Sequence, residues 1–109
     1  MSIVPTRLPV TIRRLNGFDD PACARDTWNR LLSHGDSDCV YLTWEWQRSW
    51  WTALGRGELL LMAAERGDGI VAVAPWYVDE GMVFFVGSGN SGYLDFIGDL
   101  ADLDRKSVV

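Results

Sequence analysis

Cysteine and histidine are scarce in this chain of 109 residues, which contains two Cys and one His. Cys23 and Cys39 form no C-x-x-C motif and have no neighbouring histidine, so the sequence offers no recognisable metal-binding cluster, and we expect no metal cofactor. Two widely spaced thiols predict reduced, structural cysteines rather than a disulfide framework. His34 falls at the end of a predicted helix, where a cation interacts favourably with the helix dipole.

Positive charge and long apolar runs are also limited. Ten Lys and Arg stand against fifteen Asp and Glu, and the net charge of -5 argues against binding to nucleic acid, which requires cations that neutralise phosphates. The apolar runs Leu59–Ala64 and Ile70–Val78 are far shorter than the roughly 20 residues of a membrane-spanning helix. The N-terminus lacks the apolar region of a signal peptide. We expect a soluble, cytoplasmic protein without a membrane span.

The residues that are present predict an α+β domain. Hydrophobic residues make up 48% of the chain, which is enough for a core in one small domain or in part of a larger one. Alternating apolar residues, helix caps and Asp-Gly turns define its elements. In chain order these are a strand Val10–Leu15, a helix capped by Asp19 or Asp20 and ending at Gly35, a helix Trp44–Leu54 capped by Thr43, and strands Glu58–Arg66, Ile70–Val78, Met82–Val86 and Tyr93–Ile97. The order β-α-α-β-β-β(-β) indicates a mostly antiparallel sheet with two helices.

Pro75 lies within the predicted strand Ile70–Val78. Because proline has no backbone N–H to donate to a neighbouring strand, it predicts a bulge or a sheet edge at this position.

The second predicted helix is rich in tryptophan and contains four of the six in the chain. At about 100° per residue the tryptophans form a wide apolar arc, and Gln47 projects inside it. One interpretation is that the arc packs on the sheet while Gln47 satisfies a backbone group. The other is that Trp44 and Trp51, at the rim of the arc, line a substrate groove in which Gln47 orients the ligand.

A glycine-rich segment follows the strand Met82–Val86. Gly87-x-Gly89-x-x-Gly92 matches G-x-G-x-x-G, but a dinucleotide site requires a helix after the loop, and an alternating strand pattern follows here. The segment is therefore a turn between strands or a nest of backbone amides that binds an anion. Asp95 and Tyr93 lie two residues apart and face the same side of a strand, so they are candidates for proton transfer. The alternative is that Asp95 is simply the polar member of an alternating strand.

Several short motifs occur in one order, namely Leu42-Thr43-Trp44-Glu45-Trp46 with Trp50-Trp51, Glu58-Leu59-Leu60-Leu61, Ile70-Val71-Ala72-Val73-Ala74-Pro75, Phe84-Phe85-Val86-Gly87-Ser88-Gly89 and Ser91-Gly92-Tyr93-Leu94-Asp95-Phe96. With these motifs the segment from Tyr41 to Ile97, about half of the chain, resembles the first part of a GNAT-superfamily acyltransferase domain. The domain is the one found in cellulose-biosynthesis-associated (CelD/BcsL-type) bacterial proteins, which are similar to the FemAB-like transferases.

The resemblance implies the opening half of a GNAT-like fold and the transfer of an acyl group from acyl-CoA, such as acetyl-CoA, to an amine or a sugar-linked acceptor. It implies that backbone amides near the fourth strand stabilise the oxyanion, and it points to Val86, Gly87, Ser88 and Gly89 as the cofactor-binding segment. The chain departs from the family pattern where Phe84 replaces a Gln or Arg and where Gly92 replaces an Asp.

The later helices and strands of that fold, which close the cofactor cleft, have no counterpart before Val109. We therefore expect a partial domain over residues 1–97 and a charged tail over residues 98–109 that is truncated or disordered. The isolated chain is then expected to be inactive, with a missing C-terminal half or self-association. The alternative is a non-enzymatic binding or assembly module that uses the Trp-rich helix and an open sheet edge as its interface.

Overall fold

An antiparallel sheet is the centre of the fold in the computed structural model, which describes residues 10–35, 39–67, 69–88 and 96–98. Its strands follow the order β1-β2-β3-β4, and a short β5 also pairs with β3. All pairings among these strands are antiparallel. The strands are β1 (Val10–Arg14), β2 (Glu58–Arg66), β3 (Gly69–Asp79), β4 (Met82–Phe85) and β5 (Ile97–Gly98). The predicted α+β class with a mostly antiparallel sheet is confirmed.

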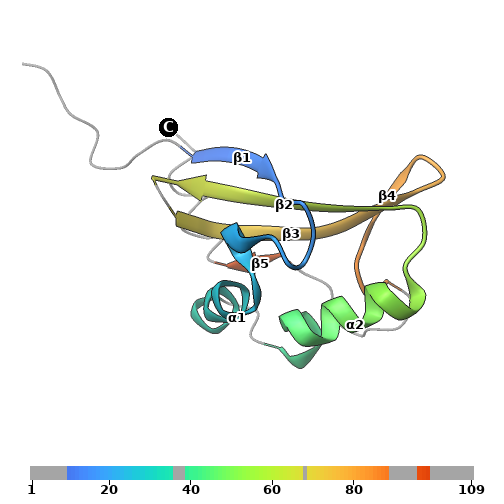
Figure 1. Cartoon of the computed structure of the whole chain (residues 1–109), viewed down its shortest axis with the longest axis horizontal. Helices are drawn as coiled ribbons and strands as arrows, with labels where there is room; N and C mark the ends of the chain where they lie inside the picture. The colour runs from blue at the N-terminus through green and yellow to red at the C-terminus, as the bar shows by residue number, and fades with distance from the viewer. Residues whose placement is uncertain (1–9, 36–38, 68, 89–95, 99–109) are drawn as a thin grey trace, which may run out of the picture.

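Two helices, α1 (Arg25–His34) and α2 (Trp44–Leu54), connect β1 to β2, and both lie on the same side of the sheet (Figure 1). As predicted, Thr43 caps α2, and its hydroxyl oxygen accepts a hydrogen bond from the Trp46 amide at 3.3 Å. A short 3-10 helix, η2 (Val40–Leu42), precedes this cap. These local signals are enough to fix where α2 begins.

The first predicted helix is divided into two pieces. The Asp20 carboxylate caps a 3-10 helix, η1 (Pro21–Cys23), by accepting a hydrogen bond from the Ala22 amide at 2.9 Å. Ala24 then takes an extended conformation with ψ of -170°, and α1 begins only at Arg25. The prediction of a continuous helix from Asp19 or Asp20 is therefore wrong, because the aspartate caps a separate turn before the α-helix.

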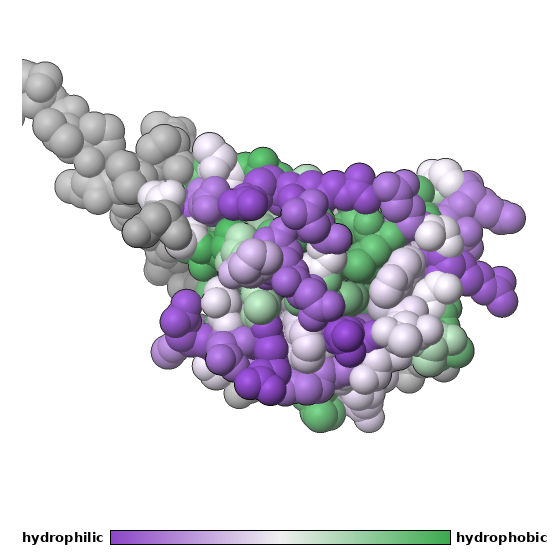
Figure 2. All heavy atoms as spheres, in the orientation of Figure 1, coloured by the Kyte–Doolittle hydropathy of each residue, from purple (hydrophilic) through white to green (hydrophobic). Residues whose placement is uncertain are grey.

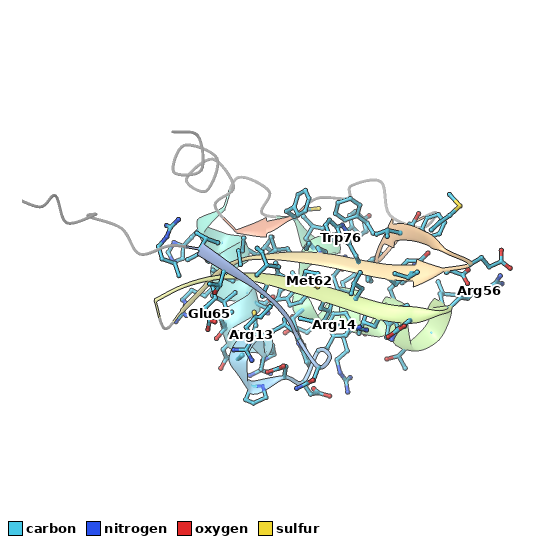
Figure 3. The ribbon with its side chains drawn as sticks, turned by 90° about the horizontal axis from the view of Figure 1, so that it is seen from above. Arg13, Arg14, Arg56, Met62, Glu65 and Trp76 are labelled. Atoms are coloured by element: carbon cyan, nitrogen blue, oxygen red, sulfur yellow. The ribbon has the colours of Figure 1, made fainter. Side chains whose placement is uncertain are left out.

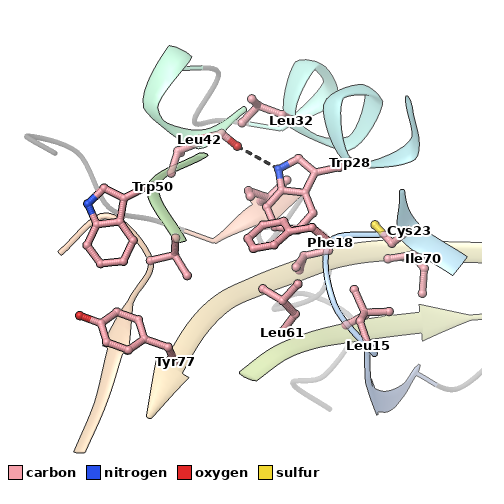
Figure 4. Packing of buried hydrophobic residues seen from close by; sticks show 14 residues of the cluster. Leu15, Phe18, Cys23, Trp28, Leu32, Leu42, Trp50, Leu61, Ile70 and Tyr77 are labelled. Atoms are coloured by element: carbon pink, nitrogen blue, oxygen red, sulfur yellow. Dashed lines mark hydrogen bonds between the residues drawn. The ribbon is translucent and has the colours of Figure 1, made fainter. Parts of the chain in front are cut away.

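The hydrophobic core lies between the sheet and the two helices (Figure 4). Trp28 is fully buried there, and its indole N–H donates to the Leu42 carbonyl at 2.9 Å. This bond attaches α1 to η2 and satisfies the polar atom that a buried tryptophan carries. The other buried apolar members are Leu15, Phe18, Cys23, Leu32, Leu42, Trp50, Leu61, Ala63, Ile70, Val73, Tyr77, Val86 and Ile97.

The outer edge of β3 changes partner along its length. It pairs with β4 from Trp76 to Asp79 and with β5 at Ala72 and Val73, so Pro75 lies between the two pairings. The carbonyl of Pro75 accepts a hydrogen bond from the Val86 amide at 2.8 Å, just after β4 ends. β3 is nevertheless an interior strand, with β2 on its other side, so Pro75 lies in the gap between the two pairings rather than at the bulge or sheet edge that its missing N–H predicted.

The other face of the sheet has no helix against it among the described residues, as the view from above shows (Figure 3). Met62 and Trp76 project on this face, which we call the open face. By contrast, hydrophilic residues cover most of the side of the molecule shown in Figure 2. The domain therefore has one sheet face packed by helices and one face without such a layer.

Candidate functional site

The candidate site is the junction at which α2 and η2 meet the end of β4. Gln47 lies in the middle of this junction and is fully buried. Its side-chain nitrogen donates to the carbonyl oxygens of Tyr41, at 2.8 Å, and Val86, at 3.3 Å. Because both neighbours are acceptors, the amide must point its NH2 group toward them, which fixes the position of its oxygen. The prediction that Gln47 satisfies backbone groups inside the apolar arc is confirmed.

The side-chain oxygen of Gln47 is buried and accepts no hydrogen bond within the described part of the chain. Buried polar atoms nearly always have a partner, and leaving one without a partner costs about 1–3 kcal/mol. A water molecule or a polar group of a ligand supplies such a partner where the space allows it. Gln47 therefore offers a fixed hydrogen-bond acceptor beside the end of β4.

The turn from Val86 to Ser88 forms the other side of the junction. Val86 is fully buried, and the Ser88 amide donates to the Phe85 carbonyl at 3.1 Å. Gly87 between them has φ of 98°, a conformation that favours glycine. Within the described ranges its amide donates no hydrogen bond, although the residue is buried. Gly89, the fourth residue of the predicted cofactor-binding segment, lies outside the described residues.

The two predicted groove tryptophans are attached at opposite ends of α2. The Trp44 indole N–H donates to the Phe18 carbonyl at 2.8 Å, and the Arg48 guanidinium lies 5.3 Å from the centre of the Trp44 ring. The Trp51 ring instead contacts Tyr77, with 5.4 Å between ring centres. Both side chains are partly buried and pack against the core, as does the more deeply buried Trp50. Packing on the sheet therefore accounts for most of the arc, and a groove formed with Gln47 stays a prediction.

The remaining predicted site residues, Tyr93 and Asp95, lie outside the described residues. Their role in proton transfer stays a prediction. Among the described residues, no group of three His, Cys, Asp or Glu side chains is arranged to hold a metal ion.

Asn29 connects α1 to α2, a role that its sequence position did not predict. Its side-chain oxygen accepts a hydrogen bond from the Trp44 amide at 2.9 Å, and its NH2 group donates to Glu45 at 2.9 Å. This contact lowers the pKa of the Glu45 carboxyl from its usual value. One side chain of α1 thus holds the first turn of α2. In the sequence, the only sign of this role was a polar residue within a predicted helix.

Comparison with known proteins adds no relative: no family model matches the chain, and neither a curated protein nor a solved structure matches it. In the part of the chain that the structure describes, no helix is long and apolar enough to cross a membrane.

Proposed function

We propose that this chain supplies the N-terminal part of a GNAT-like site that transfers an acyl group from acyl-CoA to an amine. The β1-β2-β3-β4 order, with both helices between β1 and β2, is consistent with the opening half that the resemblance implies. The observation that carries the proposal is the pair of buried polar groups at the end of β4. These are the Gly87 amide and the Gln47 side-chain oxygen, which have no hydrogen-bond partner in the described ranges.

The chemistry of acyl transfer requires a hydrogen-bond donor of this kind. The amine nitrogen attacks the thioester carbonyl carbon, and negative charge develops on the carbonyl oxygen. A buried backbone amide without a partner can stabilise that charge without reorganisation, and in our proposal Gly87 provides it. The C–S bond then breaks, the thiolate leaves, and a base takes the proton from the amine. Tyr93 and Asp95 are the candidates for this last step.

The Gln47 oxygen has a different task in this proposal, because it can only accept a hydrogen bond. It accepts one from an N–H group, either of the incoming amine or of an amide in the acyl-CoA arm. Its position is fixed by the bonds that the same side chain donates to Tyr41 and Val86. The acceptor and the oxyanion donor are thus both attached to the end of β4.

Titration of the purified chain with acetyl-CoA, followed by calorimetry and tryptophan fluorescence, tests the proposal. We expect weak but saturable binding, which Gln47→Glu weakens further, because a buried carboxylate can no longer donate to the two carbonyls. Ser49→Ala, an exposed change on the same helix, is the matched control and should bind like the original chain. The absence of a saturable response in a sample with a native circular dichroism spectrum contradicts acyl-CoA binding.

The alternative function is a non-enzymatic binding or assembly module whose interface is the Trp-rich helix and an open sheet edge. The same titration distinguishes the two functions, because an assembly module gives no response to acetyl-CoA.

A further inference from the structure

The open face is apolar across the middle of the sheet. β2 and β3 place Ala64 opposite Ala72 and Met62 opposite Ala74. Together with Ile12 and the aromatic side chains nearby, these residues line a hollow of about 320 Å³. Ile12, on the edge strand β1 opposite Ala64, is 64% exposed.

The sequence of β3 indicates that both faces of this strand are covered in the working protein. An antiparallel strand with one face in water normally alternates apolar and polar residues, whereas a strand covered on both faces is continuously apolar. β3 is apolar from Ile70 to Val78. Val73 and Tyr77 point into the helix-covered core, and the intervening Ala74 and Trp76 point to the open face. Water is therefore not the expected neighbour of this face.

Small and large side chains are separated along the strands of the open face. One cross-strand row contains Ala64 and Ala72 with Ile12 of β1 beside them, the middle row contains Met62 and Ala74 with Arg14 beside them, and the third row contains Leu60 and Trp76. Trp76 also contacts Phe85 and Phe96, with ring centres 6.3 and 5.7 Å away, so the third row is bulky. A two-fold axis that runs across the strands at the middle row would place the bulky row of one copy over the alanine row of the other. The face is thus complementary to itself, which is the requirement for a symmetric dimer.

The size of the face also suits a second copy. β2 has nine residues, and at about 3.3 Å per residue and about 4.8 Å between three or four strands the face covers roughly 500 Å². Two such faces have a combined footprint of roughly 1,000 Å², near the lower limit for a specific interface, although Ala64, Ala72 and Ala74 are themselves only 4–9% exposed. Arg14, beside the middle row, already has an ion-pair partner on this face, because its guanidinium lies 2.7 Å from the Glu58 carboxylate.

We propose that two copies of this chain pair face to face through the open face, with Trp76 of each copy over the alanines of its partner and Met62 near the two-fold axis. This pairing covers the apolar face with a second sheet at about 10 Å, the usual spacing of packed sheets. It does not depend on acyl transfer, and the interface is neither the Trp-rich helix nor the sheet edge.

Sedimentation velocity from low to several hundred micromolar tests the pairing first. We expect a monomer–dimer equilibrium in which Met62→Asp abolishes the dimer, because it brings two carboxylates together in a dry interface. Val40→Asp is the matched control: Val40 is 62% exposed but belongs to the helix layer, so this variant should dimerise normally. A monomer at every concentration, or open-ended assembly, overturns the proposal.

Disulfide trapping identifies the face without a disruptive change. In a Cys39→Ser background, Met62→Cys should form a rapid intermolecular disulfide under mild oxidation, since the two positions meet at the axis. Val83→Cys is the control because Val83 is 55% exposed, and its pairing with Val78 places it at the far end of the open face. Two copies of this position lie far apart in the proposed dimer, so they should not cross-link. Equal rates for both cysteines contradict the proposed geometry.

Discussion

The side-chain nitrogen of Gln47 lies 3.3 Å from the carbonyl oxygen of Val86 and joins the middle of α2 to the end of β4. The same nitrogen donates to the Tyr41 carbonyl at 2.8 Å, so one side chain connects three segments of the chain. Both carbonyls would otherwise lack this donor at the junction. The position of the candidate site therefore depends on a buried polar side chain as well as on apolar packing.

Replacement of Gln47 with Leu should lower the free energy of unfolding by about 1–3 kcal/mol, because two carbonyls lose a donor in a buried place. Urea denaturation monitored by tryptophan fluorescence measures the loss. Ser49→Ala, on the exposed side of α2, should change stability by less than about 0.5 kcal/mol. Equal stability of Gln47→Leu and the original chain would mean that these hydrogen bonds contribute nothing to the fold.

Gly98 should be intolerant of a side chain. Its φ is 119°, and a Cβ atom there would collide with the Val71 carbonyl oxygen. Gly98→Ala should therefore destabilise the domain by about 2–4 kcal/mol, from backbone strain and overpacking together. Gly69→Ala is the control, since a Cβ at Gly69 meets no atom within 4 Å. If thermal unfolding shows the same small change for both variants, the pairing of β5 with β3 is wrong.

Asp20 should make stability depend on pH in the acidic range. The amides of Asn16 and Ala22 donate to its carboxylate at 2.8 and 2.9 Å, and these bonds hold the pKa of Asp20 below its usual value, although burial acts in the opposite direction. A carboxyl whose pKa is lower in the folded state contributes stability above its unfolded pKa of about 3.9, and this contribution is lost as the pH falls through the folded pKa.

The variant Asp20→Asn should accordingly be less stable than the original chain by about 1–2 kcal/mol at neutral pH, since an amide offers one acceptor in place of two. The difference should narrow below about pH 4, where the original carboxylate becomes protonated. Denaturant titrations over a series of pH values give this comparison. A difference that stays constant down to the acid limit would show that the carboxylate charge is irrelevant.

The two cysteines should differ in reactivity toward a thiol reagent. Cys23 is fully buried, and burial, assisted by the negative charge of Asp20, raises the pKa of its thiol to about 11. Because the thiolate is the reactive form, Cys23 should be labelled only after unfolding, whereas the partly exposed Cys39 should be labelled in the native state. In Cys39→Ser, native labelling should be almost lost. Rapid labelling of that variant would show that the region around Cys23 opens readily.

Local sequence signals predicted much of the fold. The strand Glu58–Arg66 and the helix Trp44–Leu54 have the predicted bounds, because the apolar run before an Asp-Gly turn, the Thr43 cap and the glycines after the helix act within a few residues. The interruption at Ala24 was not predicted. Asp20 can cap either a continuous α-helix or a short 3-10 turn, and the sequence pattern does not show which of the two forms. In the structure Asp20 caps η1, and α1 begins after it, at Arg25.

The candidate site was harder to predict because its contacts are distant in sequence. The helical wheel places Gln47 inside the apolar arc, but its bond to Val86 spans 39 residues and follows from the way α2 crosses the end of β4. The role of Asn29 depends in the same way on how α1 packs against α2. In the sequence, the only sign of the open face was the continuous run of apolar residues in β3. Its rows of small and bulky side chains could not be predicted, because they follow from the register between β2 and β3.

An NMR titration of the labelled chain with acetyl-CoA tests the central claim most directly, because it reports on the Gly87 backbone amide and the Gln47 side-chain amide separately. We predict saturable shifts at these two groups and at Ser88, with no change at Gly69 at the distant β2–β3 hairpin. Binding that leaves the Gly87 and Gln47 signals unmoved, or the absence of any shift at saturating ligand, would contradict an acyl-CoA site at the end of β4.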